Sequence, residues 1–320
     1  MKNNPVRNDL LDRPVTLRNK TKETNHTKKD LIEFFRKVSF IMPALTLLLL
    51  LTAYPLYQVV LMSFYDYSDK ANPVFAGIKN YTEFIVDPMF WSALTNTVIF
   101  TATSVFFGLC FGLTFALLLN QPINTKFRAV FRSILMFPWL TSSTVVAAIF
   151  MLIFNPFGLA NKILAGFGFT DLSQTAWLGN EHTALMGVII ANIWRGFPFM
   201  MLMLLAGLQT ISNDLYEAAD IDGAGFFKKL FYITIPQLKK IIMTLATLEF
   251  IWNFRSFDLV FLMTGGGPMN SSEILSTYIY QYAFRKLNFG YASATSLFML
   301  LVMVVLSFFY IRSSIKKEGE

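Results

Sequence analysis

Polar and aromatic side chains interrupt two of the long apolar stretches in this sequence. Those whose chemistry suits contact with a polar solute are Asn192, Arg195, Trp252, Asn253, Arg255 and Asp258. Amides and charged groups form hydrogen bonds, and an indole ring offers a flat apolar surface against which another ring can pack. Where such a stretch crosses a membrane, a polar side chain is costly and marks either a solute path or a paired contact.

The spacing of these residues leaves both interpretations open. Asn253 follows Glu249 by four positions and Asp258 follows Arg255 by three, so each pair shares a helix face. In one interpretation these side chains contact a solute. In the other they are structural: Arg255 pairs with Asp258 or Glu249, and Arg195 extends its charged end to the membrane boundary.

Composition and run lengths predict an all-α integral membrane protein with six transmembrane helices. Apolar residues make up 54% of the 320 residues and charged residues 15%, whereas soluble domains are nearer a quarter charged. A helix needs about 20 apolar residues to cross a bilayer. The segments that meet this length lie near 39–64, 94–119, 133–155, 183–207, 241–263 and 291–312. We therefore expect a membrane domain over 38–312, a polar tail with an interfacial lead-in over 1–37, and a short tail over 313–320.

The basic residues orient the predicted helices. With six spans, both termini lie on one side together with the loops near 120–132 and 208–240. That side carries 20 of the 27 Lys and Arg residues, and the opposite loops carry five. Because cytoplasmic loops are enriched in Lys and Arg, both termini are expected in the cytoplasm. Topology thus accounts for the net charge of +7, and no nucleic-acid partner is predicted.

Other chemistries find no support in the sequence. The single cysteine, Cys110, falls within a predicted span, and His26 and His182 are isolated, so no metal site is expected. No nucleophile, acid–base pair or other catalytic set clusters on one side. The glycine run 265–267 is not followed by the Lys-Ser/Thr of a phosphate-binding loop, so this chain is expected to bind neither ATP nor another cofactor.

The segment 208–240 is too long and too patterned for a simple connection. A first helix is predicted after cap residues 212–214. A turn at Gly223 follows, and Asp222 can cap a second helix that stops near Pro236. Because the second helix carries an apolar face, this segment is expected to contact another protein.

This segment closely resembles the "EAA" loop of ABC-importer permeases. The matching residues are Glu217, Ala218, Ala219, Gly223, Ile233, Ile235 and Pro236, with Ile235 where the family usually has leucine. In that family the loop forms a coupling helix that seats in a cleft of the ATPase subunit. The resemblance implies that Glu217 pairs with a basic group on the ATPase and that Gly223 supplies the bend. The expected coupling residues are Glu217, Ala218, Ala219, Asp222, Gly223 and Pro236.

Most of the remaining chain resembles the carbohydrate-type branch of the family. The matching runs include Ser63–Asp66, Phe75–Tyr81, Asp87–Trp91, Phe257–Leu259, Thr264–Pro268 and Phe289–Tyr291. The Thr-Gly-Gly-Gly-Pro run is similar to that in the first of the two paired permeases of maltose-like and glycerol-3-phosphate-like systems. The chain also stops soon after Arg312, without the longer tail usual in the other permease. A pseudo-twofold heterodimer is therefore expected.

The resemblance implies an ATP-driven importer that works by alternating access. Its implied partners are a second permease, two ATPase subunits that bind ATP and Mg, an extracytoplasmic solute-binding protein, a carbohydrate solute and the bilayer. Arg255 stands where the family commonly has Asn. Together with Arg195 it suggests an acidic or phosphate-bearing sugar. Glycerol 3-phosphate or another polar solute is an alternative. A secondary transporter that uses Glu249 and Asp258 is another, but it leaves the loop at 212–236 unexplained.

Overall fold

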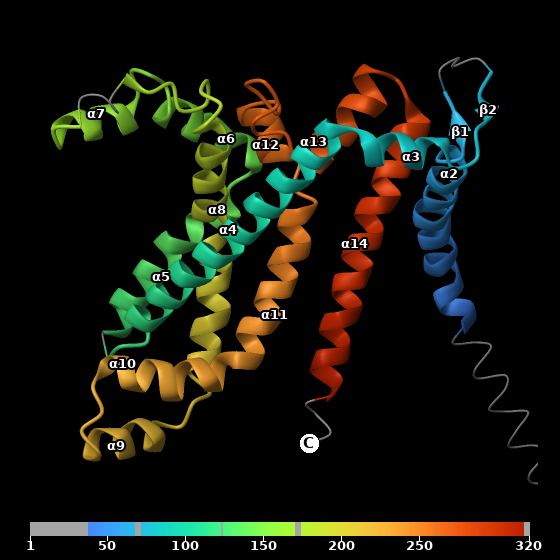
Figure 1. The fold of residues 1–320 in the computed structure, drawn as a ribbon. Helices are drawn as coiled ribbons and strands as arrows, with labels where there is room; N and C mark the ends of the chain where they lie inside the picture. The colour runs from blue at the N-terminus through green and yellow to red at the C-terminus, as the bar shows by residue number, and fades with distance from the viewer. Residues whose placement is uncertain (1–37, 68–71, 123, 170–173, 317–320) are drawn as a thin grey trace, which may run out of the picture. The chain divides into compact units, whose positions relative to one another are not determined.

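The structure is a computed structural model that describes residues 38–67, 72–122, 124–169 and 174–316 (Figure 1). The predicted tail over 1–37, and residues 317–320 of the predicted C-terminal tail, lie outside the described residues. The chain divides into two compact units, each with its own internal contacts, Met1–Leu61 and Met62–Glu320.

One apolar helix makes up the described part of the first unit and ends at Met62. Within it a π-helical turn, Leu49–Ala53 (η1), is followed by Tyr54–Met62 (α2). The wider turn comes directly before Pro55. Proline lacks an N–H and its ring collides with the carbonyl four residues earlier, so an extra residue in the turn lets the helix continue. None of the most apolar part of this helix is buried, which suits surroundings of lipid.

The second unit is built from helices and one short hairpin of two strands. Its elements in chain order are β1 (Tyr65–Asp66), β2 (Val74–Phe75), α3 (Lys79–Val86), α4 (Pro88–Leu119), α5 (Thr125–Leu140), α6 (Ser143–Ile153), α7 (Leu159–Gly166), α8 (Ala184–Leu208), α9 (Asn213–Ile221), α10 (Phe226–Lys229), η3 (Leu230–Thr234), α11 (Ile235–Phe254), α12 (Asp258–Met263), α13 (Leu275–Tyr280), η4 (Gln281–Arg285) and α14 (Phe289–Lys316). The strands pair antiparallel, with Tyr65 opposite Phe75.

The membrane class predicted from the sequence is confirmed, but helix length and composition define fewer spans than six. Within the described residues, four helices are long and apolar enough to cross a membrane, namely Val38–Met62, α4, α8 and Phe289–Phe308 of α14. The pair α5 and α6 meets the same test only if the two are counted together. Helix α11 is less apolar, because it carries Lys239, Lys240 and Glu249.

Two of the predicted spans are broken helices rather than straight ones. The span predicted over 133–155 bends by 96° between α5 and α6. Thr141 and Ser142 have extended backbones at this bend, and the Ser142 side chain caps the first turn of α6. The span predicted over 241–263 is interrupted at 255–257, between α11 and α12. Hydropathy alone does not reveal such breaks, because they depend on local hydrogen bonds that compete with the helix.

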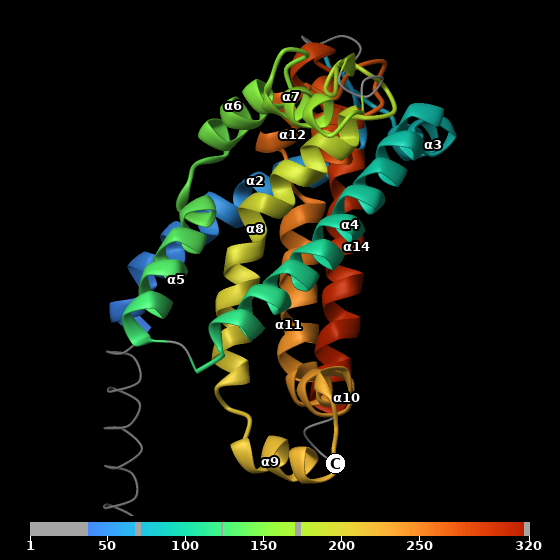
Figure 2. The same ribbon diagram turned by 90° about the vertical axis from the view of Figure 1, so that its left-hand side faces the viewer.

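Helices α4 and α8 form the most extensive helix pair of the second unit (Figure 2). Gly108 and Gly112 of α4 lie at the contact. A Cβ atom added at Gly112 would lie 3.0 Å from the backbone nitrogen of Met201 and 3.2 Å from the carbonyl carbon of Met200. Small residues spaced by four positions let two membrane helices approach this closely.

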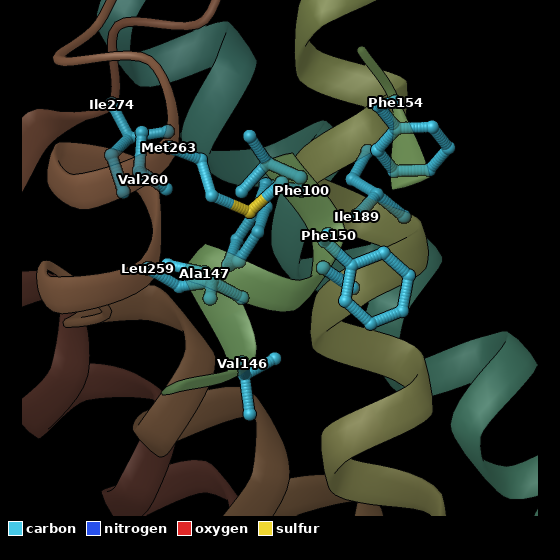
Figure 3. Packing of buried hydrophobic residues seen from close by; sticks show 12 residues of the cluster. Phe100, Val146, Ala147, Phe150, Phe154, Ile189, Leu259, Val260, Met263 and Ile274 are labelled. Atoms are coloured by element: carbon cyan, nitrogen blue, oxygen red, sulfur yellow. The ribbon is translucent and has the colours of Figure 1, made fainter. Parts of the chain in front are cut away.

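An apolar cluster holds the helices that follow the two breaks (Figure 3). Phe100 of α4, Ala147 of α6 and Leu259 of α12 are buried in it, together with Val188 of α8. Because α6 and α12 both pack on α8 through this cluster, apolar burial fixes the directions of the bends.

Hydrogen bonds from three tyrosine hydroxyl groups link the start of α4 to the C-terminal part of the chain. One carboxylate oxygen of Asp87 accepts hydrogen bonds from Tyr278 (2.6 Å), Tyr282 (3.0 Å) and Tyr291 (3.1 Å). The other caps α4 through the N–H of Met89. Burial acts to raise the pKa of Asp87, but these hydrogen bonds outweigh it and hold the pKa below its usual value.

The Thr-Gly-Gly-Gly-Pro run encloses a buried carboxyl group. Glu273 is 1% exposed, and one of its carboxyl oxygens accepts a hydrogen bond of 2.5 Å from Gln281. Gly266 has a positive φ of 91°, and a Cβ added there would lie 2.3 Å from that oxygen. The loop is held on α4 because Asn96 donates to the carbonyl oxygens of Ser271 and Glu273. The glycine run thus makes room for a carboxyl group, which its sequence alone did not indicate.

Substituting Glu273 with glutamine is expected to remove a pH dependence of stability. Burial raises the pKa of Glu273 from 4.5 to about 7, so the fold favours the neutral acid. The contribution of Glu273 to the free energy of unfolding is therefore complete below pH 4.5. It declines by up to ~3 kcal/mol as the pH rises through about 7. We expect the wild-type melting temperature in detergent to fall between pH 5 and pH 8, and that of Glu273→Gln to fall less. Exposed Glu181→Gln serves as the control, and equal pH slopes in all three proteins would contradict this prediction.

Candidate functional site

A polar cavity of about 450 Å³ lies among the membrane helices of the second unit. All six residues predicted for the solute path line it: Asn192, Arg195, Trp252, Asn253, Arg255 and Asp258. The first two come from α8, the next two from α11, and the last two from the break between α11 and α12 and the start of α12. The structure therefore brings together side chains that the sequence places in two separate stretches.

A chain of amide hydrogen bonds orders the wall of this cavity. Asn192 donates to the Oδ1 atom of Asn253 at 2.6 Å. The amide of Asn253 in turn donates to the backbone oxygen of Glu249 at 2.8 Å and to its Oε2 at 3.1 Å. Glu249 and Asn253 are buried. This network fixes the direction of Asn253, as expected for buried polar groups that are all hydrogen-bonded.

Among the described residues, neither Arg195 nor Arg255 forms an ion pair, although the charge of Arg195 acts electrostatically on Glu249. No carboxylate of the described residues lies within 4.0 Å of either guanidinium group. The pairing considered for Arg255 with Asp258 or Glu249 is therefore absent from this conformation. Arg255 is exposed where α11 ends, and Arg195 is half-buried on α8. The two guanidinium groups thus line the cavity together with the carboxyl groups of Glu249 and Asp258, without a hydrogen bond to either of them.

Aromatic rings form a second part of the wall. Trp139 stacks on Phe199 with ring centres 5.5 Å apart, and Phe199 packs against Trp252 at 5.4 Å. Trp139 and Ser104 also line the cavity, although neither was predicted. The Ser104 hydroxyl is buried without a hydrogen-bond partner among the described residues. Their sequence signal is weak, because a lone Trp or Ser in an apolar stretch is usually part of the packing.

Residues 208–240, which we call the coupling loop after the role predicted for them, have the predicted helix–turn–helix form with changed boundaries. Ser212 caps α9 through the N–H of Asp214 at 3.2 Å. Gly223 has a positive φ of 68°, which suits its predicted role at the turn. Asp222 ends α9 instead of starting the second helix, whose N-cap is Gly225.

The second helix of the coupling loop does not stop at Pro236. Helix α10 continues through the π-helical turn η3 into α11 without a break. As in η1, the wider turn precedes a proline and accommodates the missing N–H and the bulk of the ring. The prediction that Pro236 ends the helix was therefore wrong, and the coupling loop is joined directly to a helix that lines the cavity.

The coupling loop exposes an unusual amount of apolar surface. Its large apolar side chains that are more than half exposed are Ile221, Phe226, Phe227, Phe231 and Tyr232. Glu217 and Ala218 of α9 are also exposed, whereas Ala219 is half-buried. Apolar surface of this extent beside charged groups is typical of a protein interface.

Polar and charged side chains around a cavity among membrane helices often mark a solute path. This chain belongs to the family of binding-protein-dependent transport system inner membrane components, whose model matches residues 108–313. The resemblance to ABC-importer permeases found in the sequence is thereby confirmed, and the chain is a transport component by family.

Relatives match over most of the chain. It is 35% identical over 270 residues to the probable ABC transporter permease protein YurN of Bacillus subtilis, covering 84% of this chain and 92% of the relative. It is 36% identical over 286 residues to the sulfoquinovosyl glycerol transport system permease protein SmoG of Agrobacterium fabrum, covering 88% and 91%.

The fold also matches a solved permease structure. The similar chain belongs to a bacterial ABC transporter involved in the import of the acidic polysaccharide alginate, with a TM-score of 0.78 and 22% identity. The match covers 91% of this chain and 99% of the other. The helix arrangement described above is therefore that of an ABC permease.

Proposed function

We propose that this chain is the permease subunit of an ATP-driven importer for a sugar or oligosaccharide that carries an acidic group. The proposal rests on the cavity of about 450 Å³ and on the two arginines that line it. Among the described residues, neither Arg195 nor Arg255 forms an ion pair with an acidic group. A cavity of this size is in the range of small-molecule sites.

The chemistry of the wall supports a sugar acid. The guanidinium group of Arg195 is half-buried, where a charge without an ion pair is costly, and an anionic solute relieves that cost when it binds. The planar group also matches carboxylate, sulfonate and phosphate oxygens. Asn192 and Asn253 suit sugar hydroxyls, and Trp252 offers a face for the ring. The relative SmoG is named for the transport of sulfoquinovosyl glycerol.

We further propose six spans, with the bent pair α5–α6 counted as one and α11–α12 as another. Within the second unit, α9, α10 and the start of α5 lie at one end, and α7, α12 and α13 lie at the opposite end (Figures 1 and 2). This arrangement supports the predicted topology, in which the loops near 120–132 and 208–240 share the cytoplasmic side with both termini. The membrane domain is assigned to 38–312.

Alternating access is the proposed mechanism. Two partner ATPases, which hold ATP and Mg, move α9 through its exposed Glu217 and the apolar side chains beside it. The coupling loop continues directly into α8 and α11, so this movement reaches the helices that carry Asn192 and Asn253. The chain and a homologous second permease then open the cavity first to the binding protein outside and later to the cytoplasm.

The experiment that tests the class starts from the native membrane. The tagged chain is purified in mild detergent, and the proteins that accompany it are identified. A second permease, an ATPase and a solute-binding protein are the expected companions, and ligand screening of the binding protein identifies the solute. Recovery of the chain alone would favour a secondary transporter. Glycerol 3-phosphate is the second candidate solute, because the same two arginines suit a phosphate.

Replacing the two arginines is expected to change which solutes are transported. We expect Arg195→Gln and Arg255→Asn each to lower uptake of an acidic sugar roughly 10- to 100-fold, because each removes a charge-assisted hydrogen bond. Uptake of the neutral analogue should be unchanged or higher. The control is Arg132→Gln, at an exposed position on α5. Unaltered uptake of every accepted solute in both variants would overturn the acidic-solute assignment.

A further inference from the structure

Side-chain contacts fasten the two helices of the coupling loop to each other. The hydroxyl oxygens of Tyr216 on α9 and Thr234 at the end of η3 lie 2.9 Å apart. Nearby, Asp220 of α9 forms an ion pair with Lys229 of α10. Thr234 is 3% exposed and Tyr216 is half-buried, so the first contact is largely shielded from water. The ion pair joins a half-buried Lys229 to an exposed Asp220.

The Thr234 hydroxyl has a second partner. It lies 3.3 Å from the backbone oxygen of Lys229, to which it can donate. Both hydroxyl groups can donate, so the bond between Tyr216 and Thr234 has no assigned direction. Thr234 therefore joins three parts of the loop: the hydroxyl of α9, the end of α10, and its own π-helical turn.

The backbone between the two helices is a poor transmitter of force. It passes through Gly223, which has a positive φ of 68°, and Gly225. An added Cβ at either glycine would meet no atom within 4 Å. Glycine is the residue with the largest conformational freedom, so a turn built from two unpacked glycines bends easily. Backbone hydrogen bonds from Gly223 to Asp220 and from Ala224 to Ala219 close the turn at the end of α9, and the side-chain contacts stiffen the hairpin further.

Beyond Thr234, helix α11 is held in place by buried apolar contacts and reaches the cavity. Leu238 and Leu245 of α11 are each 1% exposed and pack into a cluster with α4 and α8. Asn253 follows on the same helix and lines the cavity. At 1.5 Å per residue, the distance along the helix from Thr234 to Asn253 is roughly 28 Å.

We propose that the hydrogen bond between Tyr216 and Thr234, assisted by the Asp220–Lys229 pair, transmits movement of α9 to α11. Tyr216 and Thr234 are then positioning residues for transport, although neither touches solute or nucleotide. The inference rests on the proposed function of α9 as the helix that contacts the ATPase. It adds the element that converts this contact into motion at Asn253.

The test uses the whole importer with its ATPases and binding protein in proteoliposomes. Tyr216→Phe and Thr234→Val remove the hydrogen bond and preserve side-chain shape. We expect the ATPases to co-purify as with the wild type, and solute taken up per ATP hydrolysed to fall at least fivefold in each variant. The double variant should be no worse than Thr234→Val, because that single change already removes the bond to Tyr216 as well as the contact with the Lys229 carbonyl oxygen. Thr247→Val, which removes only a hydrogen bond within α11, should keep the wild-type ratio.

The possible outcomes separate the two proposals. An unchanged transport ratio in Tyr216→Phe and Thr234→Val, with ATPases bound, overturns the transmission role alone. Loss of the ATPases from both variants also overturns it, because the contact would then serve docking. Absence of an ATPase from the wild-type complex overturns the proposed function and the transmission role together.

Discussion

Replacing Gly223 by proline is expected to abolish solute uptake while the protein remains in the membrane. Gly223 has a φ of 68°, and proline is fixed near −65°, so the turn between α9 and α10 cannot form. The surroundings of Gly223 are open, and the turn lies outside the buried apolar clusters, so the helix bundle should be retained. We expect uptake into membrane vesicles to fall at least 100-fold, with the amount of chain in the membrane, measured by immunoblot, close to that of the wild type.

A charge reversal on α9 gives the companion variant, and a neighbouring glycine gives the control. Glu217 is exposed, so Glu217→Lys leaves the fold intact and repels the basic group expected on the ATPase. Gly225 has a negative φ of −70° and open surroundings, so Gly225→Ala should transport normally. Normal uptake in either Gly223→Pro or Glu217→Lys would argue strongly against a coupling role for this loop.

The composition of the site could be predicted from the sequence because a membrane limits where polar groups occur. Asn192 and Asn253 are 61 positions apart, yet each stands out as an amide within an apolar stretch. In a soluble protein such residues would be lost among many other polar ones. The structure adds what spacing cannot give, namely that the two amides hydrogen-bond to each other and that Arg255 lines the cavity without an ion pair to any described carboxylate.

The helix breaks could not be predicted, because they arise from balances that hydropathy does not measure. Ser142 begins a new helix only because α6 finds an apolar cluster to pack against after a bend of 96°. Pro236 was expected to end a helix, and the preceding π-helical turn instead absorbs it. Trp139, which lines the cavity, lies in the last turn of α5 directly before that bend. In each case tertiary packing decides between local alternatives that the sequence leaves close in energy.

A leucine at Gly112 is expected to prevent stable assembly of the helix bundle. The Cβ atom alone would lie 2.9 Å from the Met200 Cβ, 3.0 Å from the Met201 nitrogen and 3.2 Å from the Met200 carbonyl carbon. Backbone atoms cannot rotate away as a side chain can, so α4 and α8 must separate. Overpacking typically costs about 1–3 kcal/mol, and this site lies at or above the upper end of that range.

The measurement is the fraction of detergent-solubilised protein that elutes as a single monodisperse peak, with the melting temperature of that fraction. We expect little or no folded Gly112→Leu protein. Gly166→Leu is the matched control, because an added Cβ at Gly166 meets no atom within 4 Å. A Gly112→Leu protein that melts within a few degrees of the wild type would mean that α4 and α8 are not in backbone contact here. Gly108, one turn away on α4, lines the cavity. If α4 and α8 were not in contact, another element would have to hold this part of the cavity wall.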